Sequence, residues 1–261
     1  MPSTYAHYRM GAALLPMLPA DVRRVIQRFR RLFDVGLHGP DIFLYYNPVL
    51  PTSVGALASK HHALTGREYF QRLCRVARLE KSEAAQAYIY GALCHYALDS
   101  VCHPFVNEQA EQGVATHGQI EVEFDRFLLE KDEKIPPESQ DLSNHLRLTP
   151  GECATVAKFY PPASARQVQD SLRNMAYYLK LFAVPEGARR TVLRRSMEVL
   201  GLPVRTMLMT TGANPQCAHL NEPLLEKYDL AVAQFPELLS QLQAHLTYNG
   251  VFGEEFTKIF G

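Results

Sequence analysis

Apolar residues in this chain recur at the three- and four-residue intervals of α-helices, and no stretch of useful length alternates apolar and polar positions as a half-buried strand would. We find no internal repeat at a longer period. The pattern therefore predicts an all-α, single-domain multi-helix bundle over residues 1–261. The helices are expected at residues 21–36, 66–79, 82–103, 117–131, 152–159, 165–182, 187–200 and 222–246.

Two helix starts and one helix end carry specific signals. Ser82 and Thr116 each precede a long helical pattern, and their side-chain oxygens can accept a hydrogen bond from a free N–H of the first turn. Pro104 should end or kink the helix that begins after Ser82, because proline has no N–H to donate and its ring clashes with the preceding turn. Residues 36–51 are rich in Gly and Pro, and residues 132–150 contain the run I-P-P-E-S; both are expected to be loops, the second at the surface.

The charge balance gives no indication of a polyanionic partner. The chain has 27 basic and 27 acidic side chains, so its formal net charge is zero. Arginines gather at residues 23–31 and 189–195, where a solvated helix face is the simpler interpretation and contact with nucleic acid the alternative. The oligomeric state stays open.

We recognise neither a secretory signal nor a transmembrane segment. The N-terminal apolar run lacks a positive region before it and is interrupted by Pro16. The longest apolar runs fall short of the roughly 18–20 residues that span a bilayer. The five cysteines are scattered without a C-x-x-C pair, as is typical of buried thiols in a reducing compartment. We therefore expect a cytoplasmic protein.

The chemistry of the chain concentrates in residues 87–127. Three residues follow one another at four-residue steps and a further pair repeats the spacing: His95, Asp99 and His103, then His117 and Glu121. Residues four apart share one face of a helix, and a carboxylate among apolar neighbours needs a partner. Imidazole and carboxylate together suit zinc.

Five ligand candidates exceed what one tetrahedral zinc can use. The surplus favours two or three metal ions close together, the arrangement that hydrolyses phosphate esters. The alternative, on spacing alone, is a helical bundle with exposed histidines.

Several motifs, taken in order, resemble the zinc-dependent phospholipase C family, which is related to the P1-type single-strand nucleases. They are H-Y-x-x-D, then H-P, then H-x-x-x-E, preceded by G-P-D and by an N-terminal histidine. The resemblance covers roughly residues 1–130 and implies an all-α fold with three zinc ions in a cleft. The site would then lie in residues 1–130, with residues 150–261 as a helical scaffold. The run S-K-x-H followed by E-Y-F resembles intracellular bacterial members.

The resemblance also implies a ligand set. It comprises His7, Asp41, His62, His95, Asp99, His103, His117 and Glu121. One zinc would lie between His95, Asp99, Asp41 and either His61 or His62, of which we prefer His62, and Asp99 would bridge to a second ion. The last three residues of the set would hold another zinc. His7, with the terminal amine and carbonyl, would complete a third site.

The implied reaction is attack of a zinc-bound hydroxide on a phosphodiester phosphorus, with Asp41 orienting or deprotonating the attacking water. Secreted members begin with a tryptophan whose amine binds zinc, whereas this chain has no Trp and begins Met1-Pro2, so two or three zinc ions are expected. Choline-preferring members place an aromatic residue where Ile42 stands, which weakens any preference for phosphatidylcholine.

Three functions follow from these motifs. The first is a zinc-dependent phosphodiesterase of phospholipase C type, acting on a phospholipid or a soluble phosphodiester. The second is a single-strand nuclease of P1 type, and the third a non-catalytic metal-binding helical protein.

The remaining polar residues receive simpler interpretations. His145, His219 and His245 are expected at the surface or as helix caps. His38 adjoins the G-P-D loop, where it either supports the site indirectly or has no part in it. Glu123 and Asp125 are expected to be helix-surface charges, with Asp125 a candidate partner for Arg126 or a histidine. Tyr45 and Tyr46 would either line a substrate cleft or pack in the core.

Overall fold

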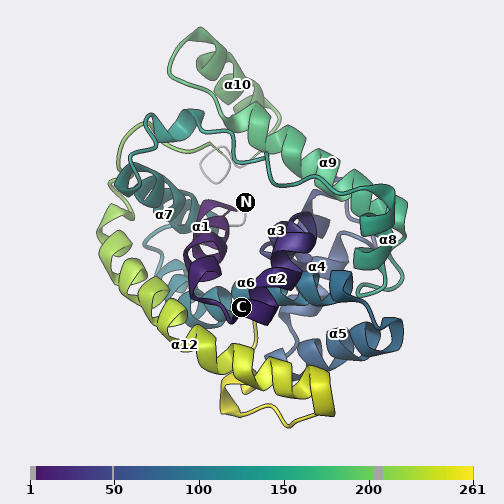
Figure 1. Ribbon diagram of the computed structural model, residues 1–261. Coiled ribbons are helices and arrows are strands. Elements are labelled where there is room, and N and C mark those ends of the chain that lie inside the picture. The colour runs from purple at the N-terminus through teal and green to yellow at the C-terminus, as the bar shows by residue number, and fades with distance from the viewer. Residues whose placement is uncertain (1–3, 49, 203–207, 261) are drawn as a thin grey trace.

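A computed structural model describes residues 4–48, 50–202 and 208–260. Its regular structure in these ranges is helical, apart from a single isolated β-bridge between Thr65 and Ile259, which confirms the all-α prediction (Figure 1). The α-helices are α1 (Thr4–Leu14), α2 (Ala20–Arg28), α3 (Arg30–Gly36), α4 (Ala56–His62), α5 (Gly66–Glu80), α6 (Glu83–Glu111), α7 (His117–Lys131), α8 (Pro150–Ala157), α9 (Ala165–Phe182), α10 (Ala188–Val199) and α12 (Asn221–Tyr248). Among the described helices we find none with the length and apolarity of a membrane span.

Helix α6 is the central element. Every residue from 87 to 100 is buried, so this part of the helix is covered on all sides, as expected for a helix at the centre of a core. Helices α1, α2, α3, α5, α7, α8 and α12 all contact it. The other helices therefore take their positions from α6.

Two glycines allow α3 and α6 to cross with their backbones in contact. A Cβ atom added at Gly91 would lie 2.2 Å from the carbonyl oxygen of Phe33, and one added at Gly36 would lie 2.4 Å from that of Tyr88. Backbone atoms cannot move aside as a flexible side chain can. The crossing therefore requires glycine on both helices.

The helix predicted over residues 21–36 is divided, which corrects that prediction. Phe29 leaves the helical region, with φ −122° and ψ 43°, between α2 and α3. A straight helix would spread its apolar residues around too much of its circumference to bury them all. The break lets α2 bury Val25 and Ile26 while α3 turns Leu32 and Val35 into the core.

The prediction that the helix starting after Ser82 ends or kinks at Pro104 is wrong about its end, because α6 continues to Glu111. Its start is confirmed, since the Ser82 hydroxyl accepts a hydrogen bond from the N–H of Ala85 at 3.2 Å. Pro104 is exposed, so its ring projects into solvent, and Val106 beyond it is buried. Packing of the continued helix thus outweighs the backbone bond that proline removes.

Thr116 begins α7 as predicted, in a capping box in which its hydroxyl accepts from the N–H of Gln119 and the Gln119 side chain bonds back to the Thr116 backbone.

The two predicted loops are more ordered than expected. Residues Gly39–Tyr45 form a 3₁₀ helix, η2, and the segment 132–150 buries Glu138 and Leu146 against the body. The second loop is therefore only partly at the surface.

Substitution Gly91→Ala tests the crossing of α3 and α6. We expect a loss of about 1–3 kcal/mol in the free energy of unfolding, because the added methyl group must displace backbone. Gly151→Ala on α8 is the matched control, since nothing lies within 4 Å of its added Cβ. Urea unfolding followed by circular dichroism measures both, and equal midpoints for the two variants would contradict the close approach.

Candidate metal centre

Helix α6 presents His95, Asp99 and His103 on one face, as their four-residue spacing predicts. Asp99 is 2 % exposed and His95 is 0 % exposed, so both lie inside the protein. A carboxylate held this deep needs compensating donors or cations.

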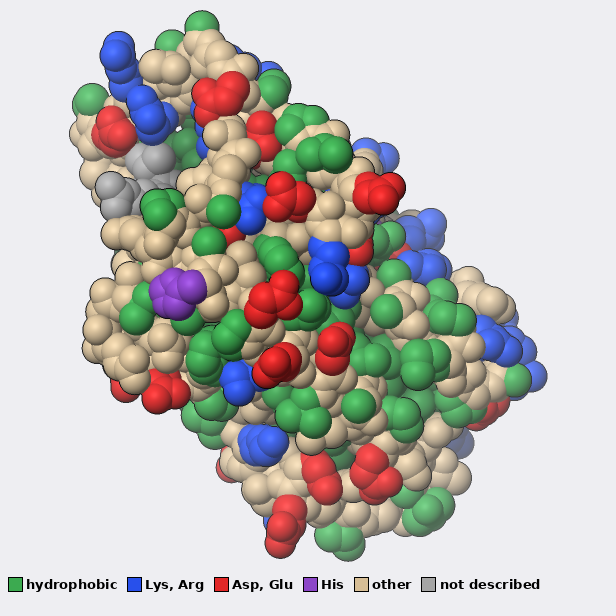
Figure 2. Space-filling model, turned by 90° about the vertical axis from the view of Figure 1, so that its left-hand side faces the viewer, with side chains coloured by type: hydrophobic (Ala, Val, Ile, Leu, Met, Phe, Trp, Pro, Cys, Tyr) green, Lys and Arg blue, Asp and Glu red, His purple; other side chains and the backbone are tan. Residues whose placement is uncertain are grey.

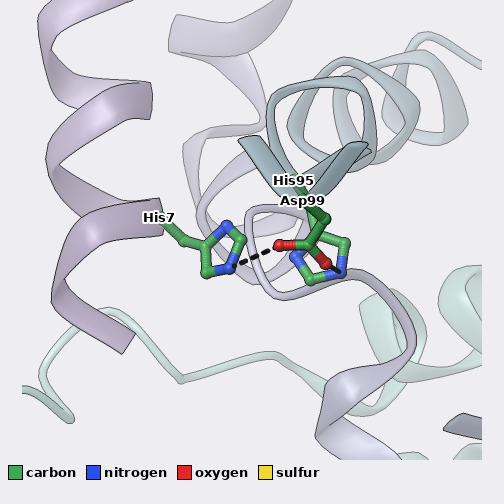
Figure 3. Close-up of side chains that lie close together, drawn as sticks. All are labelled: His7, His95 and Asp99. Carbon is green, nitrogen blue, oxygen red and sulfur yellow. Dashed lines mark ion pairs between the residues drawn. The ribbon is translucent and has the colours of Figure 1, made fainter. Parts of the chain in front are cut away.

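Four imidazoles supply that compensation to Asp99. The Nε2 atoms of His7 and His103 lie 3.2 and 3.6 Å from Asp99 Oδ1. Those of His95 and His62 lie 3.1 and 3.7 Å from Oδ2. Figure 3 shows His7 reaching across from α1 toward Asp99 and His95 on α6. Three helices thus converge on one carboxylate.

Asp41 enters the centre from η2. Its Oδ1 lies 3.2 Å from His62 Nε2. The approach depends on Gly39, which has φ +46° and whose added Cβ would lie 2.6 Å from Cδ2 of His95. The Tyr88 hydroxyl donates to the Gly39 carbonyl at 3.2 Å and so holds the loop against α6.

Of the two adjacent histidines on α4, the structure places His62 in the centre. His61 donates from Nδ1 to the Leu57 carbonyl at 2.7 Å, and its ring packs against Tyr160 with centroids 4.9 Å apart. His61 therefore bonds to its own helix through Nδ1 and packs its ring in the core, whereas His62 directs Nε2 toward Asp41 and Asp99.

A further group joins α6 to α7. Oε1 of Glu121 lies 3.2 Å from His117 Nε2 and 3.6 Å from His103 Nε2. His117 is the most open member, with a side chain 37 % exposed. This group faces solvent more than the Asp99 group does.

The eight predicted ligands thus form three groups in which the ligand atoms all lie within 4.8 Å of one another. They are His7 with His95 and Asp99, Asp41 with His62 and His95, and His103 with His117 and Glu121. The terminal amine and carbonyl expected beside His7 lie outside the described residues. That these residues bind metal stays a prediction, which their common location supports.

Buried atoms without hydrogen bonds test whether zinc suits the centre. In the described part of the chain, both ring nitrogens of His95, Nδ1 of His7 and Oδ2 of Asp99 have no hydrogen-bond partner. His95 Nε2 lies only 3.1 Å from Asp99 Oδ2, yet without hydrogen-bond geometry. Such orphaned atoms are costly, and a cation bound by His95 Nε2 and Asp99 Oδ2 would satisfy these two. The donor set, imidazole nitrogen and carboxylate oxygen, fits zinc.

The charges of the centre reinforce one another. Burial opposes ionisation of Asp99, but the surrounding histidines outweigh it and hold its pKa well below the usual range. Burial likewise opposes protonation of His62, and the carboxylates of Asp41 and Asp99 nevertheless raise its pKa to about 11. For His95 burial prevails and lowers the pKa to about 4, which leaves a neutral ring with a lone pair. The centre therefore offers ionised carboxylates that attract cations.

Hydrogen bonds from Nδ1 orient three of the rings. His103 Nδ1 lies 3.1 Å from the Phe260 carbonyl, His62 Nδ1 lies 2.8 Å from that of Ala58, and His117 Nδ1 lies 2.8 Å from Oδ1 of Asn107. A carbonyl oxygen only accepts, so Nδ1 carries the hydrogen in each ring. Nε2 is then the metal-binding atom, and at His62 zinc must displace the proton that Asp41 and Asp99 stabilise.

Asp125 positions His7, and its expected role as a helix-surface charge is wrong. Its two carboxylate oxygens accept from the N–H groups of Tyr5 and Ala6, each at 2.8 Å, at the start of α1. Glu123 is also buried, and it is this residue that pairs with Arg126, at 2.8 Å. The spacing contained a signal: Asp125 follows Glu121 by one helical turn and so shares its inward face.

The remaining histidines divide between surface, caps and core. His219 is exposed, and His245 Nδ1 donates to the Gly250 carbonyl at the end of α12, as expected of a capping residue. His145 is half-buried: its Nε2 lies 2.6 Å from that of buried His38, and its ring stacks on Tyr8 with centroids 4.4 Å apart. Neither His38 nor His145 belongs to a ligand group among the described residues.

Comparison with known protein families gives a match. A family model described as "Zinc dependent phospholipase C" matches residues 6–162, a range that contains all eight candidate ligands. Comparisons with the curated proteins and with the solved structures returned no match.

Metal content tests the groups separately. We expect two or three zinc ions per chain, and we expect His117→Gln to remove one because it breaks only the group around Glu121. The separate variant Asp99→Asn should lose at least one zinc ion from the other two groups, since its carboxylate approaches four imidazoles. Elemental analysis of dialysed protein gives the counts, with His219→Gln as the exposed-histidine control. Unchanged zinc content in Asp99→Asn would refute the assignment.

Asn107 tests the role of the outer hydrogen bonds. We expect Asn107→Ala to weaken zinc binding by about 10–100-fold, because His117 loses the acceptor that fixes its ring. Asn107→Asp keeps an acceptor and should retain most of the affinity. Competition with a chromogenic chelator measures both, and Gln112→Ala, exposed near the same end of α6, controls for surface effects. An unaltered affinity in Asn107→Ala would show that His117 needs no orienting partner.

Proposed function

The chain belongs to the zinc-dependent phospholipase C family and is thus a metal-dependent hydrolase of phosphodiesters, and we propose that it cleaves its substrate at the centre around Asp99. The observation that carries this proposal is the approach of four imidazole nitrogens to within 3.7 Å of one buried carboxylate whose Oδ2 lacks a hydrogen bond. An unsatisfied carboxylate oxygen beside several imidazoles would be costly in a purely structural core. Family membership also favours a hydrolase over the non-catalytic alternative.

The three ligand groups would hold zinc, with the family implying up to three ions. Bound zinc would supply positive charge against the charge that develops on phosphate oxygens, and would make water acidic enough to act as a nucleophile at neutral pH. The protein itself supplies the fixed geometry: its ligands come from helices and from a loop pinned by Gly39 and Tyr88. Such preorganisation is the main contribution a protein makes to this chemistry.

We assign to Asp41 the second role of orienting or deprotonating the attacking water. Its carboxylate is 5 % exposed, and although burial opposes ionisation, the charge of His62 lowers its pKa below the usual value. An ionised carboxylate at the edge of the metal groups can accept a proton from water.

The substrate we propose is a phospholipid or a soluble phosphodiester, with no preference for choline. Ile42, at the position where choline-preferring members carry an aromatic residue, is 0 % exposed and so offers no surface to a headgroup. Tyr45 is the closer candidate for lining a substrate site, because its buried hydroxyl has no hydrogen-bond partner within the described ranges.

Chelation and Asp41→Asn test the proposal together. We expect hydrolysis of a chromogenic phosphodiester to stop on chelation and to return with added zinc. Asp41→Asn should lower kcat by about 10²–10⁴-fold, the usual contribution of a general base. Zinc analysis of this variant separates its two roles: lost activity with full zinc content indicates the base, and lost zinc indicates the ligand.

Asp229→Asn, which is exposed on α12, is the matched carboxylate control and should keep full activity. Single-stranded DNA assayed beside the chromogenic phosphodiester decides between the phospholipase C and nuclease alternatives, and faster cleavage of DNA would contradict the proposed substrate. The formal net charge of zero gives no reason to expect that result.

A further inference from the structure

Helix α10 stands away from the rest of the protein. It forms the projection at the top of Figure 1, beyond the end of α9. Met197 is the one buried residue of this helix, which is described over its whole length. Most of its surface is therefore free to meet something outside the molecule.

The inward face of α10 is fixed by specific contacts. Met197 packs with Phe182 and Leu208 in a small hydrophobic cluster separate from the main core. Arg190 donates to the Val184 carbonyl at 2.9 Å, and its Nε lies 3.4 Å from Glu186. Met197 and Arg190 lie on the same side of the helix, which identifies the opposite side as the one that faces away from the protein.

That opposite side carries exposed aliphatic residues beside Arg195. At the 100° that an α-helix turns per residue, Val192 and Val199 point away from Met197, and their exposed fractions are 64 % and 87 %. Leu200 and Leu202, just after the helix, are 71 % and 38 % exposed. Single exposed aliphatic residues are ordinary, but four gathered on one projection mark an interaction surface.

Arginines surround these aliphatic side chains. Arg189, Arg194 and Arg195 are all exposed. Of these three, only Arg194 has an ion-pair partner among the described residues, Glu198 at 3.9 Å. Figure 2 shows the same mixture at the top of the molecule, where Lys and Arg side chains lie among hydrophobic ones with a few acidic residues. The local charge is positive although the whole chain is neutral.

We propose that α10 and residues 200–202 dock on an anionic phospholipid surface. The arginines would contact lipid phosphates while the two valines and two leucines enter the boundary between headgroups and acyl chains, as amphipathic interfacial helices do. This inference rests on the proposed function, because a phospholipid surface would then also present the substrate.

Two other occupants fit less well. In a symmetric dimer through this face, Arg195 would lie near its own copy, and like charges in an interface are repulsive. Nucleic acid would use the arginines but has no place for the exposed aliphatic side chains. A lipid interface satisfies both kinds of residue.

The docking surface is connected to the metal centre through α9. The Tyr178 ring lies 5.9 Å from that of Phe182 beneath α10, and 6.4 Å from that of Tyr45. Asn174 donates to the Tyr45 carbonyl at 3.1 Å, and Tyr45 ends the same 3₁₀ helix that carries Asp41. A lipid surface at α10 would therefore be linked through α9 to the 3₁₀ helix that carries Asp41.

Vesicle binding tests the proposal. Full-length protein is sedimented with vesicles of phosphatidylcholine alone or mixed with phosphatidylglycerol, in chelator so that no lipid is cleaved. We expect binding to the mixed vesicles that weakens with salt. The variant Arg189→Gln/Arg194→Gln/Arg195→Gln should bind at least about 10-fold more weakly, and Val192→Ser/Val199→Ser about 10-fold more weakly. Arg24→Gln and Val251→Ser, exposed elsewhere, serve as matched controls.

The same proteins loaded with zinc are then assayed on vesicle phospholipid and on a soluble phosphodiester. Loss of vesicle hydrolysis with full soluble activity in both α10 variants supports docking. Wild-type protein that cleaves the soluble ester but binds no vesicles overturns docking and leaves the proposed function intact. Vesicle binding without cleavage of either substrate supports docking and refutes the proposed function. Binding of single-stranded DNA that only the arginine variant loses would overturn docking in favour of nucleic acid.

Discussion

The structure depends on a carboxylate that is buried in the middle of a helix. Asp99 is 2 % exposed and sits in the part of α6 that other helices cover on every side. An ionised group in such a place is stable only if opposite charge or hydrogen-bond donors come to it. Here they come from α1, from α4 and from α6 itself. The packing around α6 is thus inseparable from the chemistry of one side chain.

The elements that bring those donors are held by contacts well outside the ligand groups. Asp125 accepts from the first turn of α1 and so fixes the helix that carries His7. Gly36 and Gly91 let α3 pack directly on α6, which positions the start of the loop leading to Asp41. The accuracy of the centre depends on these contacts, because a metal ligand that is misplaced loses affinity even when its chemistry is right.

Local spacing predicted much of this arrangement, and tertiary packing decided the rest. The four-residue steps from His95 to His103 placed three side chains on one face, and the structure keeps them there. The break at Phe29 and the passage of α6 through Pro104 were missed because packing overrode local propensity. The Phe260 carbonyl was beyond reach for another reason: it is backbone, 157 residues from the His103 that it orients, and no side-chain pattern marks it.

The Phe260 contact also changes the meaning of the division between a metal-site half and a scaffold half. All candidate ligands precede residue 130, yet the Phe260 ring is 0 % exposed and lies 5.5 Å from that of His62 and 5.7 Å from that of His95. The Phe260 ring therefore packs against two of the candidate ligands, while the Phe260 carbonyl selects the tautomer of His103. Metal binding and the docking of this segment stabilise the same arrangement, so each should favour the other. The candidate ligands all come from the first half of the chain, but the centre also depends on contacts from the second half.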